Sequence, residues 1–200
     1  ALIKKCLPRY PDIAKPVDLF SSVYPEDYPK VFNLRVERPW GAWNVVAVFN
    51  YDEPELEVQV IMKELGLDRE KKYFAYDFWD ERFLGIVKND MTIMVPAHSV
   101  KLLNLQEKRN HPWVLSTDMH ITQGAVELRD LRWNGAEGIL SGSCERPKGE
   151  KGILTVYLPE GYKIGHTKNA QVVKVDNQVV QVKLEFVDRI VSWEIALGKP

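Results

Sequence analysis

Short apolar stretches with a period of two follow one another from residue 31 to the end of the chain, and this pattern limits the fold more than any other feature. In the stretch 179–186 apolar residues alternate with polar ones, which is typical of a strand that buries one face. The stretch 43–50 is apolar on both faces, which predicts a central strand covered on both sides. About fourteen such stretches, separated by turn residues and with almost no helical period, predict an all-β fold. The predicted strands are 31–37, 43–50, 56–62, 72–79, 82–87, 91–95, 98–105, 112–117, 125–133, 138–144, 152–158, 170–175, 179–186 and 191–197.

The first part of the chain does not share this pattern. Residues 1–11 have a short apolar spacing that suits a helix, which Pro8 and Pro11 would end. Five of the chain's twelve prolines fall before residue 30. Prolines restrict both themselves and the residue before them to extended backbone, so this part predicts a short helix followed by a proline-rich tether.

The polar stretch 106–112 contains a proline and is the predicted boundary between two sandwiches. We therefore expect a helix and tether at 1–30, a first antiparallel β-sandwich at 31–108 and a second at 109–200, both immunoglobulin-like. The alternative is one large sandwich with a long surface loop at 106–112. Inside the second sandwich, Asn134-Gly135 predicts a tight hairpin, because both residues tolerate positive φ.

Composition excludes several classes of partner. The formal net charge is −1, from 27 basic and 28 acidic residues, and no long block of like charge offers a surface for nucleic acid. No apolar run approaches the ~20 residues of a membrane span. Cys6 and Cys144 lie far apart, a usage that suits a reducing compartment, so we expect a cytoplasmic location. The chain opens on Ala1, and we expect it to be a fragment.

The stretch 116–124, STDMHITQG, most resembles an active site. Ser116, Asp118 and His120 are two apart, so in an extended strand their side chains would share one face. A shared face is not a catalytic triad, which also needs converging side chains and an oxyanion hole. The stronger interpretation is a turn in which Thr117 and Asp118 bond the local backbone and Gly124 supplies the required φ. We therefore expect no catalytic residue in this chain.

Metal binding is also not indicated. The four histidines lack the local spacing that fixes two ligands of a metal site, so we expect neither a metal nor a cofactor. The histidines are His98, His111, His120 and His166.

Six tryptophans are present, and exposed ones could stack on sugar rings. Trp43 and Trp193 lie on the apolar phase of their strands and are predicted to be in the core. Trp40 and Trp79 lie beside turns, and together with Trp113 they are the candidate platforms for carbohydrate.

Four stretches together resemble the C-terminal region of clan D glycoside hydrolases, above all the α-galactosidase-like (melibiase-type) enzymes of family 36. They are AKPVDLF, WNVVAVFNYD, VPAHSVKLLNLQ and STDMHITQGAVELRDLRWNG. Their order and spacing carry the resemblance, which covers nearly the whole chain. Each motif alone is only moderately specific, because related sandwiches also end other barrel glycosidases.

The resemblance implies a non-catalytic accessory region that packs on the catalytic (β/α)8 barrel of the same polypeptide and can aid oligomerisation. Residues 1–11 would then be the last barrel helix, and an apolar patch should be exposed near residues 1–30. The alternative is a carbohydrate-binding module that uses exposed tryptophans. Asp118 and His120 would satisfy the loop backbone or face the barrel, and Trp40, Trp79 and Trp113 would contact carbohydrate or the barrel.

The family's catalytic pair is two aspartates, one in a Lys-x-Asp context. Lys88-Asn89-Asp90 and Lys174-Val175-Asp176 match this context but lie in predicted hairpins. Neither aspartate is assigned a catalytic role, so the parent protein is expected to be a glycoside hydrolase whose carboxylate pair lies outside this chain.

Overall fold

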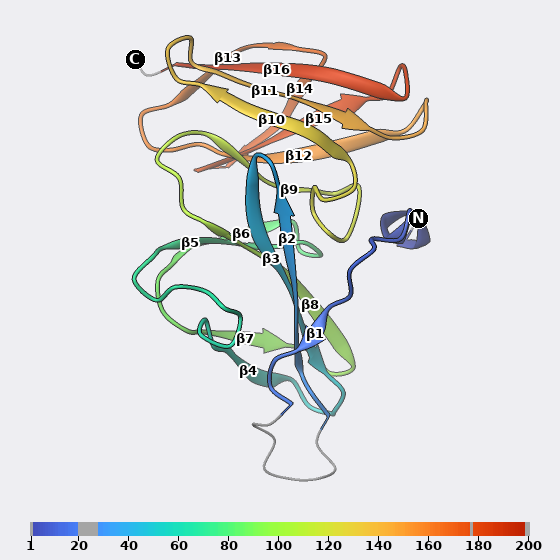
Figure 1. Cartoon of the computed structure of the whole chain (residues 1–200), viewed down its shortest axis with the longest axis vertical. Helices are drawn as coiled ribbons and strands as arrows, with labels where there is room; N and C mark the ends of the chain where they lie inside the picture. Colours follow the sequence, from blue (N-terminus) through green and yellow to red (C-terminus); the bar gives the residue numbers. More distant parts are fainter. Residues whose placement is uncertain (1, 20–27, 177, 199–200) are drawn as a thin grey trace. The chain divides into compact units, whose positions relative to one another are not determined.

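A computed structural model describes the chain over residues 2–19, 28–176 and 178–198. Within these residues regular structure is almost entirely β-strand, and the paired strands run antiparallel (Figure 1). The prediction of an all-β fold of antiparallel sandwiches is confirmed. The chain divides into two compact units, which are described separately. The first unit holds residues 1–10, 38–41 and 109–200, and the second unit holds residues 11–37 and 42–108.

The second unit is built on a six-stranded sheet with the order β1-β2-β3-β8-β5-β6 and a two-stranded ribbon, β4-β7. Its strands are β1 (Lys15–Pro16), β2 (Val31–Arg38), β3 (Gly41–Asn50), β4 (Leu56–Val60), β5 (Tyr73–Asp77), β6 (Arg82–Val87), β7 (Met91–Val95) and β8 (Ser99–Glu107). One core cluster joins the sheet to the ribbon and includes Val46, Val60 and Leu103, none of which is exposed. In β3 the residues 43–46 are all buried, as expected for a strand that lies inside its sheet.

The first unit is a sandwich of two four-stranded sheets with the orders β10-β11-β16-β13 and β14-β15-β12-β9. Its strands are β9 (Trp113–Thr117), β10 (Leu128–Asn134), β11 (Ile139–Glu145), β12 (Lys151–Tyr157), β13 (Lys163–Lys168), β14 (Gln171–Asp176), β15 (Val179–Glu185) and β16 (Ile190–Gly198). The alternation predicted for β15 is present: Val180, Val182 and Leu184 point into the core, where they lie in one cluster with Trp193. The predicted burial of Trp43 and Trp193 is confirmed as well.

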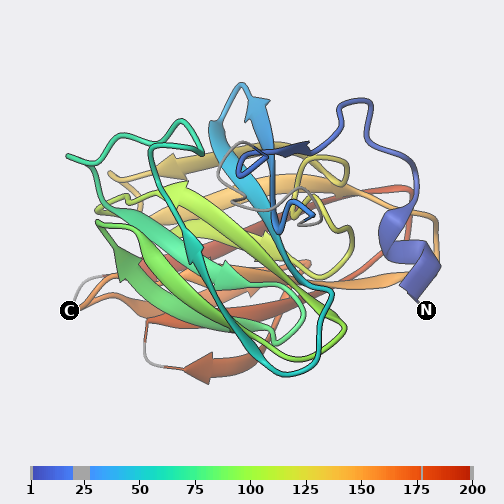
Figure 2. The ribbon, with the colours of Figure 1, turned by 90° about the horizontal axis from the view of Figure 1, so that it is seen from below.

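The N-terminal part begins with η1 (Leu2–Cys6), a 3-10 helix none of whose residues is buried. In Figures 1 and 2 this helix lies beside the loop that follows β9. Farther on, β1 pairs with the edge of β2, so part of the predicted tether is a two-residue edge strand. Residues 20–27 of that tether lie outside the described residues. Among the described residues, no helix has both the length and the apolar character needed to cross a bilayer.

The hairpin between β10 and β11 is present, but its turn differs from the prediction. Asn134 pairs with Ile139, so residues 135–138 form the connection, and the left-handed residue is Gly138 (φ 66°). The Asn134 side chain accepts hydrogen bonds from the amides of Ala136 and Glu137 at 3.1 and 3.3 Å, which holds the turn in the manner of an Asx-turn. The expectation that Asn134-Gly135 would supply the positive φ was therefore wrong.

Candidate functional site: the loop from residue 116 to residue 127

The polar stretch that most resembled an active site does not place its three candidate residues on one strand face. Strand β9 ends at Thr117, and the chain then turns, so Asp118 and His120 lie outside the strand. The Ser116 hydroxyl donates to the Gln123 side-chain oxygen at 2.8 Å, whereas both ring nitrogens of His120 have other partners. Ser116 and His120 are not paired as a nucleophile and its base, which is the arrangement that acyl-transfer chemistry needs.

Asp118 connects the loop to the neighbouring strand β12. Its side-chain oxygen accepts the Ile153 amide at 2.6 Å, and its own amide donates to the Ile153 carbonyl at 3.1 Å. The expectation that Asp118 bonds local backbone was therefore wrong, because its partner lies 35 residues away in sequence. The left-handed turn was predicted correctly at Gly124 (φ 113°), and Gln123 (φ 56°) is left-handed too.

Glu127 is the centre of the loop's hydrogen bonding, and its side chain is not exposed at all. The Thr117 hydroxyl and the Gly124 amide donate to one of its oxygens, the second at 3.1 Å, and the Val126 amide donates to the other at 3.3 Å. Burial raises the pKa of Glu127 above its ordinary value, and the hydrogen bond from Thr117 is the largest of the effects that oppose this. The carboxyl group thus ties β9 to the start of β10.

His120 is buried, with 1% of its surface exposed, and it faces the N-terminal segment. The Thr122 amide donates to Nδ1 at 3.1 Å, which makes Nδ1 the acceptor and places the ring hydrogen on Nε2. Nε2 then donates to the Pro8 carbonyl at 3.0 Å. Both nitrogens are therefore used to hold main chain, and no carboxylate of the described residues pairs with the ring.

Arg146 approaches the same segment from the end of β11. Its guanidinium donates to the carbonyls of Leu7 at 3.0 Å and Lys4 at 3.4 Å, and to the Glu150 carboxylate at 3.2 Å. The amide of Ile121, next to His120, donates to the Lys5 carbonyl at 2.8 Å. Four backbone carbonyls of the segment thus accept hydrogen bonds from the loop and from Arg146: those of Lys4, Lys5, Leu7 and Pro8.

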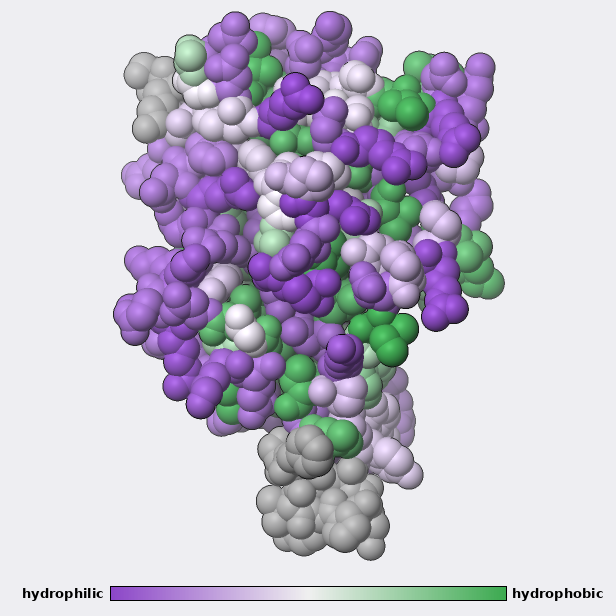
Figure 3. Space-filling model, viewed as in Figure 1, coloured by the Kyte–Doolittle hydropathy of each residue, from purple (hydrophilic) through white to green (hydrophobic). Residues whose placement is uncertain are grey.

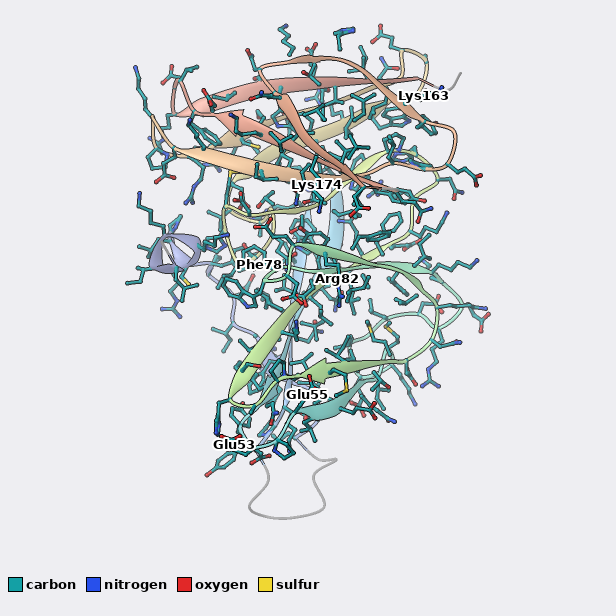
Figure 4. All side chains as sticks on the ribbon, turned by 180° about the vertical axis from the view of Figure 1, so that it is seen from behind. Glu53, Glu55, Phe78, Arg82, Lys163 and Lys174 are labelled. Atoms are coloured by element: carbon teal, nitrogen blue, oxygen red, sulfur yellow. The ribbon has the colours of Figure 1, made fainter. Side chains whose placement is uncertain are left out.

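The three candidate tryptophans lie in different surroundings. Trp113 is buried in the first unit, where the Arg109 guanidinium lies 3.9 Å from its ring centroid. Trp40 is half-buried, and its indole N–H finds no hydrogen-bond partner within the described part of the chain. Trp79 is half-buried in the turn between β5 and β6, which Phe78 and Arg82 bracket in Figure 4. Trp40 and Trp113 belong to the first unit, and Trp79 belongs to the second.

The aspartates of the two Lys-x-Asp motifs make structural contacts. Asp90 accepts the Met62 amide at 2.8 Å and pairs with Arg69 at 2.7 Å. Asp176 ends strand β14 and lies 3.7 Å from Lys174. Over the described ranges, no three His, Cys, Asp or Glu side chains converge as a metal site would require.

Sequence reasoning missed Glu127 and Arg146, which contribute the most donors and acceptors to the site. Glu127 lies three positions after Gly124, a spacing at which an acidic side chain can cap free amides, and this signal was available. The contacts of Arg146 with the N-terminal segment had no local signal, because these two partners lie 139 and 142 residues before it.

Comparison with known proteins gives one family match. Residues 40–105 match the family model described as the alpha galactosidase C-terminal beta sandwich domain. No curated protein sequence matches the chain.

Three solved structures are similar to parts of the chain. A GH27 β-L-arabinopyranosidase from Geobacillus stearothermophilus is 25% identical over 48% of this chain and 20% of its own, with a TM-score of 0.37. Alpha-galactosidase I from Mortierella vinacea is 20% identical over 40% of this chain and 21% of its own, with a TM-score of 0.34. An isomalto-dextranase from Arthrobacter globiformis T6 is 12% identical over 86% of this chain and 34% of its own, with a TM-score of 0.33.

The matched part of the arabinopyranosidase is only a fifth of that protein, so the chain is much shorter than the enzymes it is similar to. The family match begins one residue before β3 and ends within β8. Over residues 40–105 it confirms the resemblance of this chain to the C-terminal β-sandwich region of α-galactosidase-like clan D glycoside hydrolases.

Proposed function

We propose that this chain is a non-catalytic accessory region of an α-galactosidase-like glycoside hydrolase, and that its N-terminal segment docks on the catalytic barrel of the same polypeptide. One observation carries the docking proposal. In the segment 2–10 four backbone carbonyls accept hydrogen bonds from the loop after β9 and from Arg146, whereas the residues Leu2, Ile3 and Leu7 are 62%, 75% and 54% exposed.

This arrangement is the reverse of the usual one, in which a segment buries its apolar side chains against the body that holds it. Apolar surface also gathers where the N-terminal helix lies in Figure 3. Farther along, Ile13, Leu19 and Tyr28 are exposed as well. A run of exposed apolar side chains in one short segment marks an interaction surface, and the polypeptide that precedes the segment is its natural occupant.

Reading the coding sequence upstream of Ala1 is the first test. A (β/α)8 barrel with two aspartates at strand ends supports the proposal, and an unrelated upstream domain contradicts it. If the barrel is present, the full polypeptide permits a test of docking.

In that polypeptide, Leu2, Ile3 and Leu7 would be replaced together by Ser. The matched control replaces Val173, Val175 and Val187, which are similarly exposed in the first unit but lie outside the segment. We expect the first triple variant to lower the melting temperature of the full polypeptide and to leave that of residues 1–200 unchanged. Equal effects of the two triple variants on the full polypeptide would contradict docking through the segment.

The alternative function is carbohydrate binding. Trp113 offers a sugar little surface because it is buried, and Trp40 and Trp79 are each half-buried. Titration of residues 1–200 with galactosides, followed by tryptophan fluorescence, distinguishes the functions. Saturable binding that is lost in Trp79→Ala would favour a carbohydrate-binding module over an accessory role.

A further inference from the structure

The edge strands of the larger sheets differ from the inner strands in their register. Strands β6, β9, β10, β13 and β14 each end a sheet, and each carries one residue more than the neighbour it pairs with. The extra residues are Leu84 in β6, Leu115 in β9, Arg129 in β10, Gly165 or His166 in β13 and Val173 in β14. The inner pairs β3-β8, β5-β8, β11-β16 and β12-β15 run in continuous register. All five of these β-bulges therefore lie on edge strands.

The other edges are protected in different ways. Strand β1 is only two residues long and ends with Pro16, which has no amide hydrogen to donate. The ribbon strands β4 and β7 have five residues each; Pro54 lies shortly before β4, and Pro96 directly follows β7. Every sheet edge in the described part of the chain thus has a feature that hinders the addition of another strand.

Strand β14 is the edge with the greatest tendency to pair with another strand. It contains Val172, Val173 and Val175, a residue type that favours strands, and it has no proline. Val173 and Val175 are 47% and 62% exposed. The next strand before it in sequence, β13, belongs to the other sheet of the sandwich, so β15 is the strand with which β14 pairs. A straight strand in this position would offer backbone groups to a second copy of the chain.

Val173 interrupts that edge near its middle. Val172 and Lys174 have register partners on β15, whereas Val173 between them has none. Two residues of β14 opposite one of β15 bend the strand and increase its twist. The bulge therefore breaks the regular row of N–H and C=O groups with which a second strand would pair.

Lys174 is a second obstacle at the same place. If the bulge were removed, two antiparallel copies of β14 in full overlap would place Lys174 opposite Lys174 of the second copy. Like charges directly opposite each other destabilise a strand pair. Asp176 lies 3.7 Å from Lys174, but both side chains are 56% exposed, so this ion pair neutralises the lysine only weakly.

We propose that the edge bulges prevent this chain from associating with itself by strand pairing, and that Val173 and Lys174 together close the edge at β14. Partners of this region are then bound through surfaces other than the sheet edges. The proposal concerns strands inside each unit and does not depend on whether a catalytic barrel precedes the chain.

Three variants of residues 1–200 test the proposal at β14: deletion of Val173, Lys174→Thr, and the two changes together. Deletion of Val173 gives β14 and β15 a continuous register, and the residue it removes is exposed and lies outside the core cluster. In the double variant, full overlap would place Val172 opposite Val175 of the second copy, with no like charges between them. Near-UV circular dichroism checks that each variant keeps its tertiary packing.

The readout is specific for strand pairing. Amide hydrogen exchange of β14 is measured by NMR over a range of protein concentrations, alongside sedimentation. In the double variant we expect the β14 amides that do not bond β15 to gain protection as the concentration rises, with association at about tenfold or more lower concentration than in the wild type. Association through another surface, such as the exposed segment 2–10, would leave these amides unchanged.

Lys183→Thr is the matched control for the loss of a lysine, because Lys183 lies on β15, an inner strand of the same sheet. It should behave as the wild type does. A folded double variant whose β14 amides gain no protection would overturn the proposal. Equal association of Lys174→Thr and the double variant would overturn the role of the bulge.

The wild type decides the case in which the deletion variants do not fold. We expect the exchange of its β14 amides to be independent of protein concentration. Protection that rises with concentration in the wild type would mean that β14 pairs despite its bulge, which also overturns the proposal.

Discussion

Asp118 and Ile153 exchange two hydrogen bonds, from the Ile153 amide to the Asp118 carboxylate at 2.6 Å and from the Asp118 amide to the Ile153 carbonyl at 3.1 Å. A side chain thereby takes the place of a backbone carbonyl at the point where β9 leaves its neighbour β12. The hydrogen bonds between β9 and β12 thus continue past the end of β9, and they fix the position at which the loop begins.

Asp118→Ala should lower the free energy of unfolding by about 1–3 kcal/mol, because the Ile153 amide loses its acceptor in a partly buried place. Asp118→Asn keeps an oxygen there and should cost less. Urea denaturation of both variants checks this, with the exposed residue Asp12 as the control for loss of an aspartate. Equal stabilities of Asp118→Ala and Asp12→Ala would contradict the role of the contact.

Glu127 predicts a pH dependence of stability. Its pKa is raised in the folded state above the ordinary value of 4.5, so its contribution to stability is full below pH 4.5 and is lost as the pH rises through the folded pKa. Glu127→Gln cannot ionise and should therefore gain stability relative to the wild type as the pH rises from 4 to 8. Parallel stability profiles of the two proteins, measured by urea denaturation across this range, would show that the carboxyl is not perturbed.

The control for this experiment is Glu127→Ala. It leaves three donors without an acceptor, from Thr117, Gly124 and Val126, and should cost about 2–4 kcal/mol at pH 4. This difference should shrink as the pH rises and the wild type loses stability. A small loss in this variant would mean that water replaces the carboxyl, and that the loop does not depend on it.

Gly142 should not tolerate a side chain. A Cβ there would lie 2.6 Å from the Asp130 carbonyl oxygen and 2.8 Å from the Trp193 ring, and neither a strand backbone nor a buried ring can move aside easily. Gly142→Ala should destabilise the first unit by about 1–3 kcal/mol. Thermal denaturation followed by tryptophan fluorescence measures the effect.

Gly165→Ala is the matched control for Gly142→Ala. Its Cβ would lie 3.5 Å from Ala196, an ordinary contact, and it is also on a strand of the same sheet. If both variants lose the same stability, the cost reflects glycine itself and not the close approach of β10 and Trp193.

The strands could be predicted because their physical cause is local. A one-face-buried strand must alternate, and β15 does so from Val180 to Leu184. Strand β13 was missed because Lys163–Lys168 is mostly exposed and has no alternation, and only its pairing with β16 makes it a strand. The register and the sheet order were not accessible, since they depend on partners far apart in sequence.

The site was less predictable than the fold. The stretch 116–124 was recognised as polar and as a turn, and the left-handed residue Gly124 was found from its sequence. What the polar side chains bond could not be found, because Asp118 reaches β12 and His120 reaches a carbonyl 112 residues away. A single sequence shows which residues can donate and accept, and only the folded chain decides which of them meet.

The distance in sequence between Arg146 and Leu7, 139 residues, also has a consequence for synthesis. At about 5–20 residues per second, a ribosome needs roughly 7–28 s to add the residues that separate them. During that time the N-terminal segment has emerged without the donors that later hold it, although the second unit can already fold. The contacts that hold the segment can therefore form only late, after residues 109–200 have been made and Arg146 has left the exit tunnel.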